Sequence, residues 1–212
     1  MGKMARTANY SVLKKYLPKE QFDENYALIS HYIQLQGTKK AEKYEKEIIA
    51  KNINLSLLPR KNDFNKAVEI PYTNKEEKFT FIDLFAGIGG FRMALQNCGG
   101  ECVFSSEWDE SAKQTYFANY GEVPFGDITK DEVKAFIPEH FDVLCAGFPC
   151  QAFSIAGYQK GFDDVRGTLF FDVADIIEKH RPKAFYLENV KKATNSDILA
   201  ALTSEDKATA LL

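Results

Sequence analysis

From Phe79 onward, short apolar runs alternate with segments of helical spacing, and this alternation limits the possible fold more than any other feature. The apolar runs are rich in β-branched and aromatic residues, as strands are: FTFIDLF, ECVFSSEW, FDVLCAGF and KAFYLENV. The segments between them repeat apolar residues every three or four positions, as helices do: FRMALQNCG, DESAKQTYFANYG and TLFFDVADIIEKHRP. Strands and helices that alternate in this way predict an α/β fold with a doubly wound parallel sheet.

The first 78 residues follow a different pattern. Residues 1–60 repeat apolar residues at helical spacing, whereas residues 61–78 are polar and irregular, which indicates a linker. We therefore divide the chain into a helical extension with its linker (1–78), an α/β domain (79–192) and an unassigned tail (193–212). The extension carries 15 Lys and Arg against 10 Asp and Glu, whereas the remainder carries 12 against 20.

Composition argues against several classes of protein. The chain has no apolar run near the roughly 18 residues that span a bilayer, and its N-terminus lacks the apolar stretch of a secretory signal. Its four cysteines are therefore expected to be free thiols. Cys98 and Cys102 have no second Cys or His pair at zinc-site spacing, so we expect no metal. These features predict a cytoplasmic protein with no membrane partner.

The first strand candidate ends in a glycine bend, residues 86–90. Glycines at this place let a ligand approach the backbone and open the next helix. The second strand candidate ends in Glu107 and Trp108. Glu107 lies twenty residues after Gly87, where an acid suits a ribose diol, and Trp108 beside it suits an adenine face. Residues 127–128 offer a polar loop end for the adenine amino group. Together they predict a nucleoside cofactor, either a dinucleotide or S-adenosylmethionine; a bend that only packs a helix and a surface acid are the alternatives.

The stretch GFPCQAFS leaves the third strand candidate and places Cys150 directly after Pro149. The proline ring fixes its own φ and restricts the preceding residue, which holds Cys150 in a defined direction. Near backbone N–H groups at a strand end, such a thiol can be held as the reactive thiolate. A buried structural thiol is the alternative, and Cys145, inside the strand, fits that role.

Glu188 ends the fourth strand candidate. A carboxylate in an apolar setting is costly to desolvate unless it has a partner or a task, and burial lets it hold a proton near neutral pH. An exposed glutamate at a strand tip is the alternative. Because parallel strands end at one edge of a sheet, we expect Cys150 and Glu188 to face one cavity beside the cofactor.

These segments, in this order, resemble the DNA (cytosine-5) methyltransferases of bacterial restriction–modification systems. FIDLFAGIGGFRMAL is similar to the family's cofactor motif, GFPCQAFS to its nucleophile motif and YLENVK to its glutamate motif, with SEWDESA, GDIT and RGTLFF between them. The resemblance covers about residues 79–192. It implies the Rossmann-like fold of S-adenosylmethionine-dependent methyltransferases, S-adenosylmethionine as methyl donor, and cytosine in duplex DNA as acceptor in a bacterial cytoplasm.

The resemblance also implies a role for each matching residue. Cys150 would attack carbon 6 of a cytosine flipped out of the duplex, and Glu188 would protonate or hydrogen-bond ring nitrogen 3. The cofactor pocket would contain Phe85, Ala86, Gly87, Ile88, Gly89, Glu107, Trp108, Asp127, Ile128, Pro149 and Leu169. The target-base pocket and its mobile loop would contain Phe148, Gln151, Ser154, Asn189 and Val190.

After Lys191 the sequence departs from the family, which continues with an arginine-bearing motif, a DNA-reading region and a closing asparagine motif. We therefore expect an incomplete sheet in a chain that is truncated, or completed by a second chain that supplies the target-recognition region. Because base contacts specify sequence, we also expect this chain to be inactive alone. Residues 1–78 could touch DNA, bind a second subunit or form a solvated appendage, and we favour the appendage.

Other functions fit the sequence less well. The chain could be a non-catalytic remnant or subunit that binds cofactor or a partner, and the same cysteine chemistry could methylate cytosine in RNA. A nicotinamide dehydrogenase would use the glycines and Glu107 but would leave Cys150 and Glu188 without a role. Methylation of DNA uses all of these residues.

Overall fold

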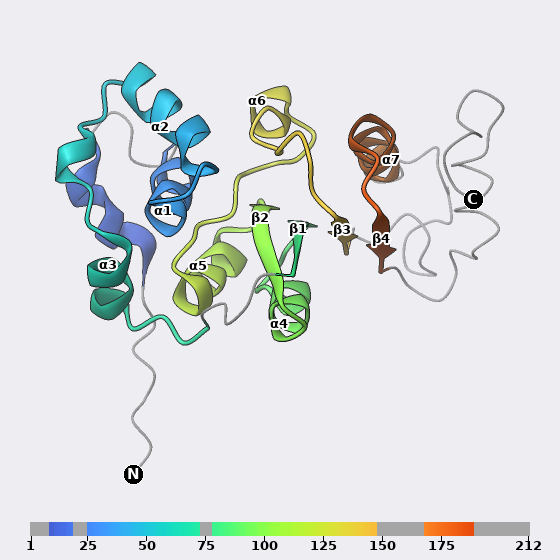
Figure 1. Ribbon diagram of the computed structural model, residues 1–212, viewed down its shortest axis with the longest axis horizontal. Coiled ribbons are helices and arrows are strands. Elements are labelled where there is room, and N and C mark those ends of the chain that lie inside the picture. The colour runs from blue at the N-terminus through green and yellow to red at the C-terminus, as the bar shows by residue number, and fades with distance from the viewer. Residues whose placement is uncertain (1–8, 19–24, 73–77, 148–167, 189–212) are drawn as a thin grey trace, which may run out of the picture. The chain divides into compact units, whose positions relative to one another are not determined.

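The computed structural model describes residues 9–18, 25–72, 78–147 and 168–188 (Figure 1). The chain forms two compact units. The helical unit consists of Met1–Thr73, Gly87–Met93 and Glu107–Gly126, and the sheet unit of Asn74–Ala86, Ala94–Ser106 and Asp127–Leu212. Each unit therefore combines three stretches that are separate in the sequence.

The sheet unit contains four parallel strands in the order β2-β1-β3-β4, which confirms the predicted α/β class. The strands are β1 (Phe79–Leu84), β2 (Gly100–Ser106), β3 (Val143–Ala146) and β4 (Ala184–Leu187). Their last residues lie in register, with Leu84 opposite both Ser106 and Ala146, and Ala146 opposite Leu187. Every strand thus ends at the same edge of the sheet.

The order of the strands reverses between β1 and β3, and this reversal marks one position on that edge. From β1 the chain moves to β2 on one side, and then to β3 and β4 on the other side of β1. In doubly wound sheets this reversal, between the first strands of the two halves, is where ligands bind. The loops after β1 and β3 therefore leave the sheet at the expected place for a site.

Burial explains why the strands read as continuous apolar runs. All seven residues of β2 and the last four of β1 are buried, as expected for parallel strands that are covered on both faces. β4 instead alternates exposed and half-buried residues. The connections contain α4 (Gly90–Asn97), α5 (Glu110–Tyr120), α6 (Asp131–Lys134) and α7 (Thr168–His180), of which α6 was not predicted.

Asp142, just before β3, joins the beginnings of three strands. Its carboxylate accepts hydrogen bonds from the backbone N–H of Thr80 at 2.7 Å and the Thr80 hydroxyl at 3.0 Å, and pairs with Lys183 Nζ at 2.7 Å. The bond from Lys183, followed by that from the Thr80 N–H, lowers the pKa of Asp142 to about 2.

This depressed pKa predicts a loss of stability in acid. The contribution of Asp142 is present above the unfolded pKa of about 4 and is lost as the pH falls towards 2. Because Lys183 is largely exposed, we expect the contribution to be below about 1 kcal/mol. Thermal unfolding between pH 5 and pH 2 should therefore show a smaller drop in Tm for Asp142→Asn than for the wild type; equal drops would contradict the prediction.

The helical unit contains the N-terminal elements together with α5. These elements are η1 (Tyr10–Tyr16), α1 (Tyr26–Leu35), α2 (Ala41–Ala50), η3 (Leu55–Leu57) and α3 (Lys61–Val68). Phe117 of α5 is fully buried, and its ring lies 6.2 Å from that of Tyr10 and 6.1 Å from that of Phe64. Ser30 Oγ accepts the N–H of Val123 at 2.9 Å.

These contacts correct two interpretations of the sequence. The N-terminal segment is not a solvated appendage, because its aromatic residues pack against Phe117 of α5 and Ser30 bonds the segment that follows α5. Residues 61–68 are also not an irregular linker. They form α3, which buries a single side chain, Phe64.

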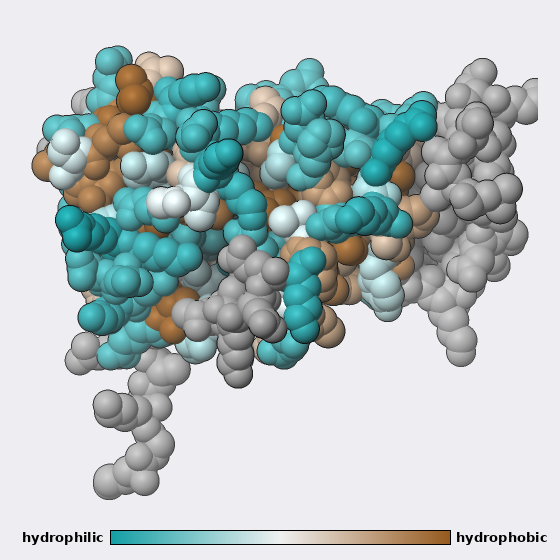
Figure 2. Space-filling model, in the orientation of Figure 1, coloured by the Kyte–Doolittle hydropathy of each residue, from teal (hydrophilic) through white to brown (hydrophobic). Residues whose placement is uncertain are grey.

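The surface drawn in Figure 2 is mainly hydrophilic, with apolar side chains scattered over it. The exposed large apolar residues include Ile49 and Leu57 in the helical unit, and Phe171 and Tyr186 in the sheet unit. Within the described ranges, no helix is both long and apolar enough to cross a membrane.

Candidate functional site

The glycine bend after β1 has an unusual backbone. Phe85, Gly87 and Gly89 have φ angles of 55°, 54° and 90°, all in the left-handed region. For the non-glycine Phe85 this conformation costs about 1–2 kcal/mol, and residues in such conformations cluster at functional sites. The N–H of Ala86 donates to the carbonyl of Ser106 at 2.9 Å, which fixes the beginning of the bend to the end of β2.

The carboxylate of Glu107 is held by three backbone N–H groups. Its Oε2 accepts the N–H of Gly87 at 2.8 Å, and its Oε1 accepts those of Trp108 and Asp109, both at 2.8 Å. The N–H of Glu107 itself donates to the carbonyl of Phe125 at 2.8 Å. A carboxylate has about four acceptor positions, so Oε2 keeps one for a further donor such as a ribose hydroxyl.

The remaining cofactor candidates differ in accessibility. Trp108 is 72% exposed and Ile88 is 58% exposed, so both present apolar surface to solvent. Asp127 Oδ1 accepts the N–H and the hydroxyl of Thr129, both at 2.9 Å, which fixes this loop end. Ile128 is buried, and Leu169 is half-buried on α7. The sequence prediction placed all of them in one pocket, and that shared pocket stays a prediction.

Glu188 follows β4, and its N–H donates to the carbonyl of Ala146 at 2.9 Å. This bond places the backbone of Glu188 beside the end of β3, from which GFPCQAFS departs. The Glu188 side chain is exposed, so the expected burial of its carboxylate is wrong and it lies at a strand tip. The short strand ends with Leu187, which is itself only half-buried, and Glu188 follows it.

Seven predicted site residues lie outside the described residues: Phe148, Pro149, Cys150, Gln151, Ser154, Asn189 and Val190. The expectation that Cys150 and Glu188 face one cavity therefore stays a prediction. The predicted absence of a metal also stays a prediction. No group of three or more His, Cys, Asp or Glu side chains suited to a metal occurs in the part of the chain that the structure describes.

Cys145 on β3 is the structural thiol that the sequence suggested. It is 1% exposed, and burial, followed by the nearby Asp83, raises its pKa to about 12. At pH 8 we therefore expect iodoacetamide to leave Cys145 unmodified in the folded protein while it alkylates the exposed Cys98. Peptide mass mapping, with urea-unfolded protein as control, measures this; equal alkylation of both thiols would contradict it.

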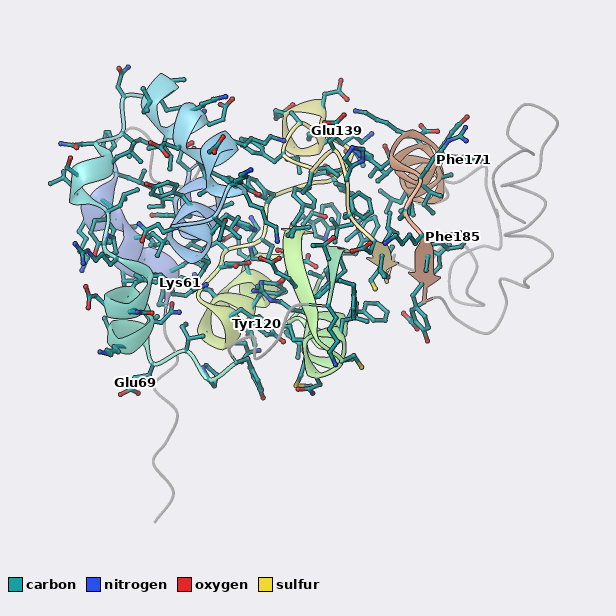
Figure 3. The ribbon with its side chains drawn as sticks, in the orientation of Figure 1. Lys61, Glu69, Tyr120, Glu139, Phe171 and Phe185 are labelled. Carbon is teal, nitrogen blue, oxygen red and sulfur yellow. The ribbon has the colours of Figure 1, made fainter. Side chains whose placement is uncertain are left out.

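A buried charged cluster in the helical unit escaped the sequence prediction. Arg92 of α4 pairs with Glu122 at 2.5 Å, donates to the hydroxyl of Tyr116 at 3.0 Å, and lies 4.5 Å from the ring centroid of Tyr120. Tyr120, labelled in Figure 3, donates its O–H to the carbonyl of Gly89 at 2.6 Å. The only feature of the sequence that could have indicated this cluster is an arginine among the apolar positions of FRMALQ.

His31 of α1 lies beside this cluster, with Nε2 3.7 Å from a carboxylate oxygen of Glu122. Burial lowers the pKa of His31, which therefore stays neutral near pH 7. Burial alone would raise the pKa of Glu122, but the charge of Arg92 and the hydrogen bond from its guanidinium hold this pKa below its ordinary value. Glu122 is thus an anion whose main partner is Arg92.

The fold and the bend together define a class of protein. A doubly wound parallel sheet with a glycine bend after β1 and an acid after β2 is the arrangement of nucleoside-binding Rossmann-like folds. The remaining acceptor position of Glu107, the exposed ring of Trp108 and the open space around Gly87 fit the ribose and adenine of such a ligand.

The model of the family "C-5 cytosine-specific DNA methylase" matches residues 79–204, and the chain belongs to this family. The match confirms the resemblance found in the sequence. It begins at the first residue of β1, so the N-terminal elements lie outside it.

Two of its relatives are type II methyltransferases. M.HpaII of Haemophilus parainfluenzae is 73% identical over 124 residues, which are 58% of this chain and 35% of that protein. M.HhaI of Haemophilus parahaemolyticus is 61% identical over 117 residues, which are 55% and 35%. The solved structure of the S. pombe Dnmt2 methyltransferase has a TM-score of 0.44 and 21% identity, over 58% of this chain and 42% of that one. The chain spans about a third of the length of the curated relatives it matches.

Proposed function

We propose that this chain carries the part of an enzyme that binds S-adenosylmethionine and holds the nucleophile for methylation of carbon 5 of cytosine in duplex DNA. The observation that carries the proposal is the carboxylate of Glu107, fixed by three backbone N–H groups at the glycine bend. A carboxylate held in this way can accept a ribose hydroxyl without reorganising. Family membership supports S-adenosylmethionine over a dinucleotide.

The chemistry is assigned to Cys150 and Glu188. S-adenosylmethionine, when bound, would supply an electrophilic methyl group and would leave as the thioether S-adenosylhomocysteine. The Cys150 thiolate adds to carbon 6 of the flipped cytosine and makes carbon 5 nucleophilic, while Glu188 protonates or hydrogen-bonds ring nitrogen 3. After carbon 5 has gained the methyl group, it loses its proton to water and the carbon 6–sulfur bond breaks. This restores the aromatic ring and the thiolate.

Binding of the cofactor is the first test. The chain has one tryptophan, Trp108, which is exposed next to Glu107, so its fluorescence should change on titration with S-adenosylmethionine. Glu107→Gln removes the charge and one acceptor oxygen, and we expect it to weaken binding about 10- to 100-fold. Isothermal titration calorimetry provides a second readout, and NAD⁺ serves as the control ligand. Saturable binding of NAD⁺ without binding of S-adenosylmethionine would refute the proposal.

Methyl transfer is the second test. By resemblance, the region that reads bases lies beyond residue 192, so we propose that these 212 residues transfer little methyl to DNA alone and gain activity with a chain that supplies that region. Incorporation of tritiated methyl into duplex DNA measures the activity of the chain alone and of the chain with its complement. RNA is the alternative acceptor in the same assay. Cys150→Ser should abolish the gained activity, whereas Cys145→Ser should retain it. Transfer by the chain alone would refute the proposed need for the second region.

A further inference from the structure

We propose that two buried supports position the cofactor site: the cluster of Arg92, Glu122 and Tyr120, and helix α1 of the N-terminal segment, which lies outside the family match. The proposal rests on the proposed function for the identity of the ligand. It concerns residues of the helical unit alone. Arg92, Glu122 and Tyr120 are then positioning residues that act through the glycine bend and through Glu107.

The first connection reaches the glycine bend. The carbonyl of Gly89 accepts two hydrogen bonds, from the Tyr120 hydroxyl at 2.6 Å and from the N–H of Met93 at 3.0 Å. The second of these bonds belongs to the first turn of α4, so Tyr120 fixes the point at which the bend becomes a helix. The Arg92 guanidinium lies against the Tyr120 ring and pairs with Glu122, which holds the ring in place.

The second connection reaches Glu107. Its N–H donates to the carbonyl of Phe125, so the segment from Glu122 to Phe125 supports the acid that faces the cofactor. α1 holds this same segment at two points. Ser30 Oγ accepts the N–H of Val123 at 2.9 Å, and the ring of His31 lies 4.8 Å from that of Phe125.

Both ends of the predicted cofactor site therefore depend on buried supports: the glycine bend depends on Tyr120, and Glu107 depends on the segment 122–125 that α1 holds. The hydrogen bond from Gly87 N–H to Glu107 Oε2 joins the glycine bend to Glu107. Tyr120 fixes the glycine bend, and the segment beside α1 fixes Glu107. A displacement of either support changes the distance that this bond spans. Because a preorganised site binds more tightly than one that must be ordered on binding, cofactor affinity should respond to residues that never touch the cofactor.

Two conservative substitutions test the first connection. Tyr120→Phe keeps the ring against Arg92 and removes only the hydroxyl, and Tyr116→Phe removes a hydroxyl that bonds Arg92 but not the bend. We expect Tyr120→Phe to weaken binding of S-adenosylmethionine about three- to tenfold, and Tyr116→Phe less than twofold. Equal effects of the two variants, or none from Tyr120→Phe, would overturn the proposal.

A second pair tests the contribution of α1. Ser30→Ala leaves the Val123 N–H without its acceptor, whereas Gln36→Ala breaks bonds to Pro59 and Lys61 that lie within the N-terminal segment. We expect Ser30→Ala to weaken binding about three- to tenfold and Gln36→Ala to leave it within twofold. Circular dichroism and Tm verify that each variant is folded. Equal binding by all folded variants would refute the role of α1.

A readout without cofactor separates this proposal from the proposed function. Amide hydrogen exchange at Met93 reports whether the first turn of α4 is fixed at Gly89. Exchange at this amide should be several-fold faster in Tyr120→Phe than in the wild type or Tyr116→Phe, even if S-adenosylmethionine does not bind. Failure of the wild type to bind refutes the proposed function, whereas unchanged exchange in Tyr120→Phe refutes the positioning role.

Discussion

Replacing Arg92 with methionine is expected to lower the free energy of unfolding by about 3–5 kcal/mol, because the change leaves the carboxylate of Glu122 buried without its charged partner. The two side chains are only 7% and 5% exposed, so water cannot replace the lost partner. Arg92→Met also removes the guanidinium from the rings of Tyr116 and Tyr120. Urea unfolding at pH 7, followed by circular dichroism, measures the change.

A double variant distinguishes the buried charge from lost packing. Buried ion pairs can often be replaced by apolar residues at little cost, so Arg92→Met with Glu122→Leu should recover much of the lost stability. The control is Lys134→Met, which breaks the more exposed pair with Asp172 and should cost less than about 1 kcal/mol. A loss below about 1 kcal/mol in Arg92→Met would contradict the interpretation that Glu122 depends on this partner.

Gly89→Ala is expected to destabilise the protein by about 2–4 kcal/mol, because two effects add. The φ of 90° at this residue strains any side chain, and a Cβ atom would lie 2.3 Å from Cε2 of the buried Tyr120 ring. The ring cannot move without losing its bond to the Gly89 carbonyl. Thermal unfolding of the variant measures the effect, and a Tm within a degree of the wild type would contradict it.

Gly87→Ala is the matched control for the glycine bend. Its φ is 54°, but no atom lies within 4 Å of the added Cβ, so we expect a cost of only about 1 kcal/mol from the backbone. The same open space is where the cofactor is predicted to approach. Gly87→Ala should therefore fold but bind S-adenosylmethionine weakly. The main effect of Gly89→Ala should instead be a loss of stability.

The four strands could be predicted from sequence because each is a short apolar run with a clear end. Residues 81–84 and 100–106 are all buried, so these stretches of the sequence are mainly apolar or small and indicate strands with little ambiguity. α3 could not be predicted in this way. It buries only Phe64, and the packing of that ring against Phe117, distant in the sequence, decides its structure.

The candidate site also contains residues that the sequence predicted and residues that it did not. Ligands bind at the carboxyl ends of parallel strands, and this regularity identified Gly87 and Glu107, which are hydrogen-bonded to each other. It succeeded because both residues lie in short loops directly after predicted strands. The supporting cluster was missed because the partnership of Arg92 with Glu122 depends on how α4 and the end of α5 pack. The roles of Cys150 and Glu188 depend on the resemblance and stay predictions.

The interleaved composition of the helical unit has a consequence for synthesis on the ribosome. Its N-terminal stretch ends at Thr73, but the partners that it buries extend to Gly126. At roughly 5–20 residues per second, the helices of the N-terminal stretch are all complete about 3–10 s before their last partner has been made. During this interval their apolar faces have only each other and chaperones to cover them, so truncated translation products that end before α5 should be degraded faster than the full chain.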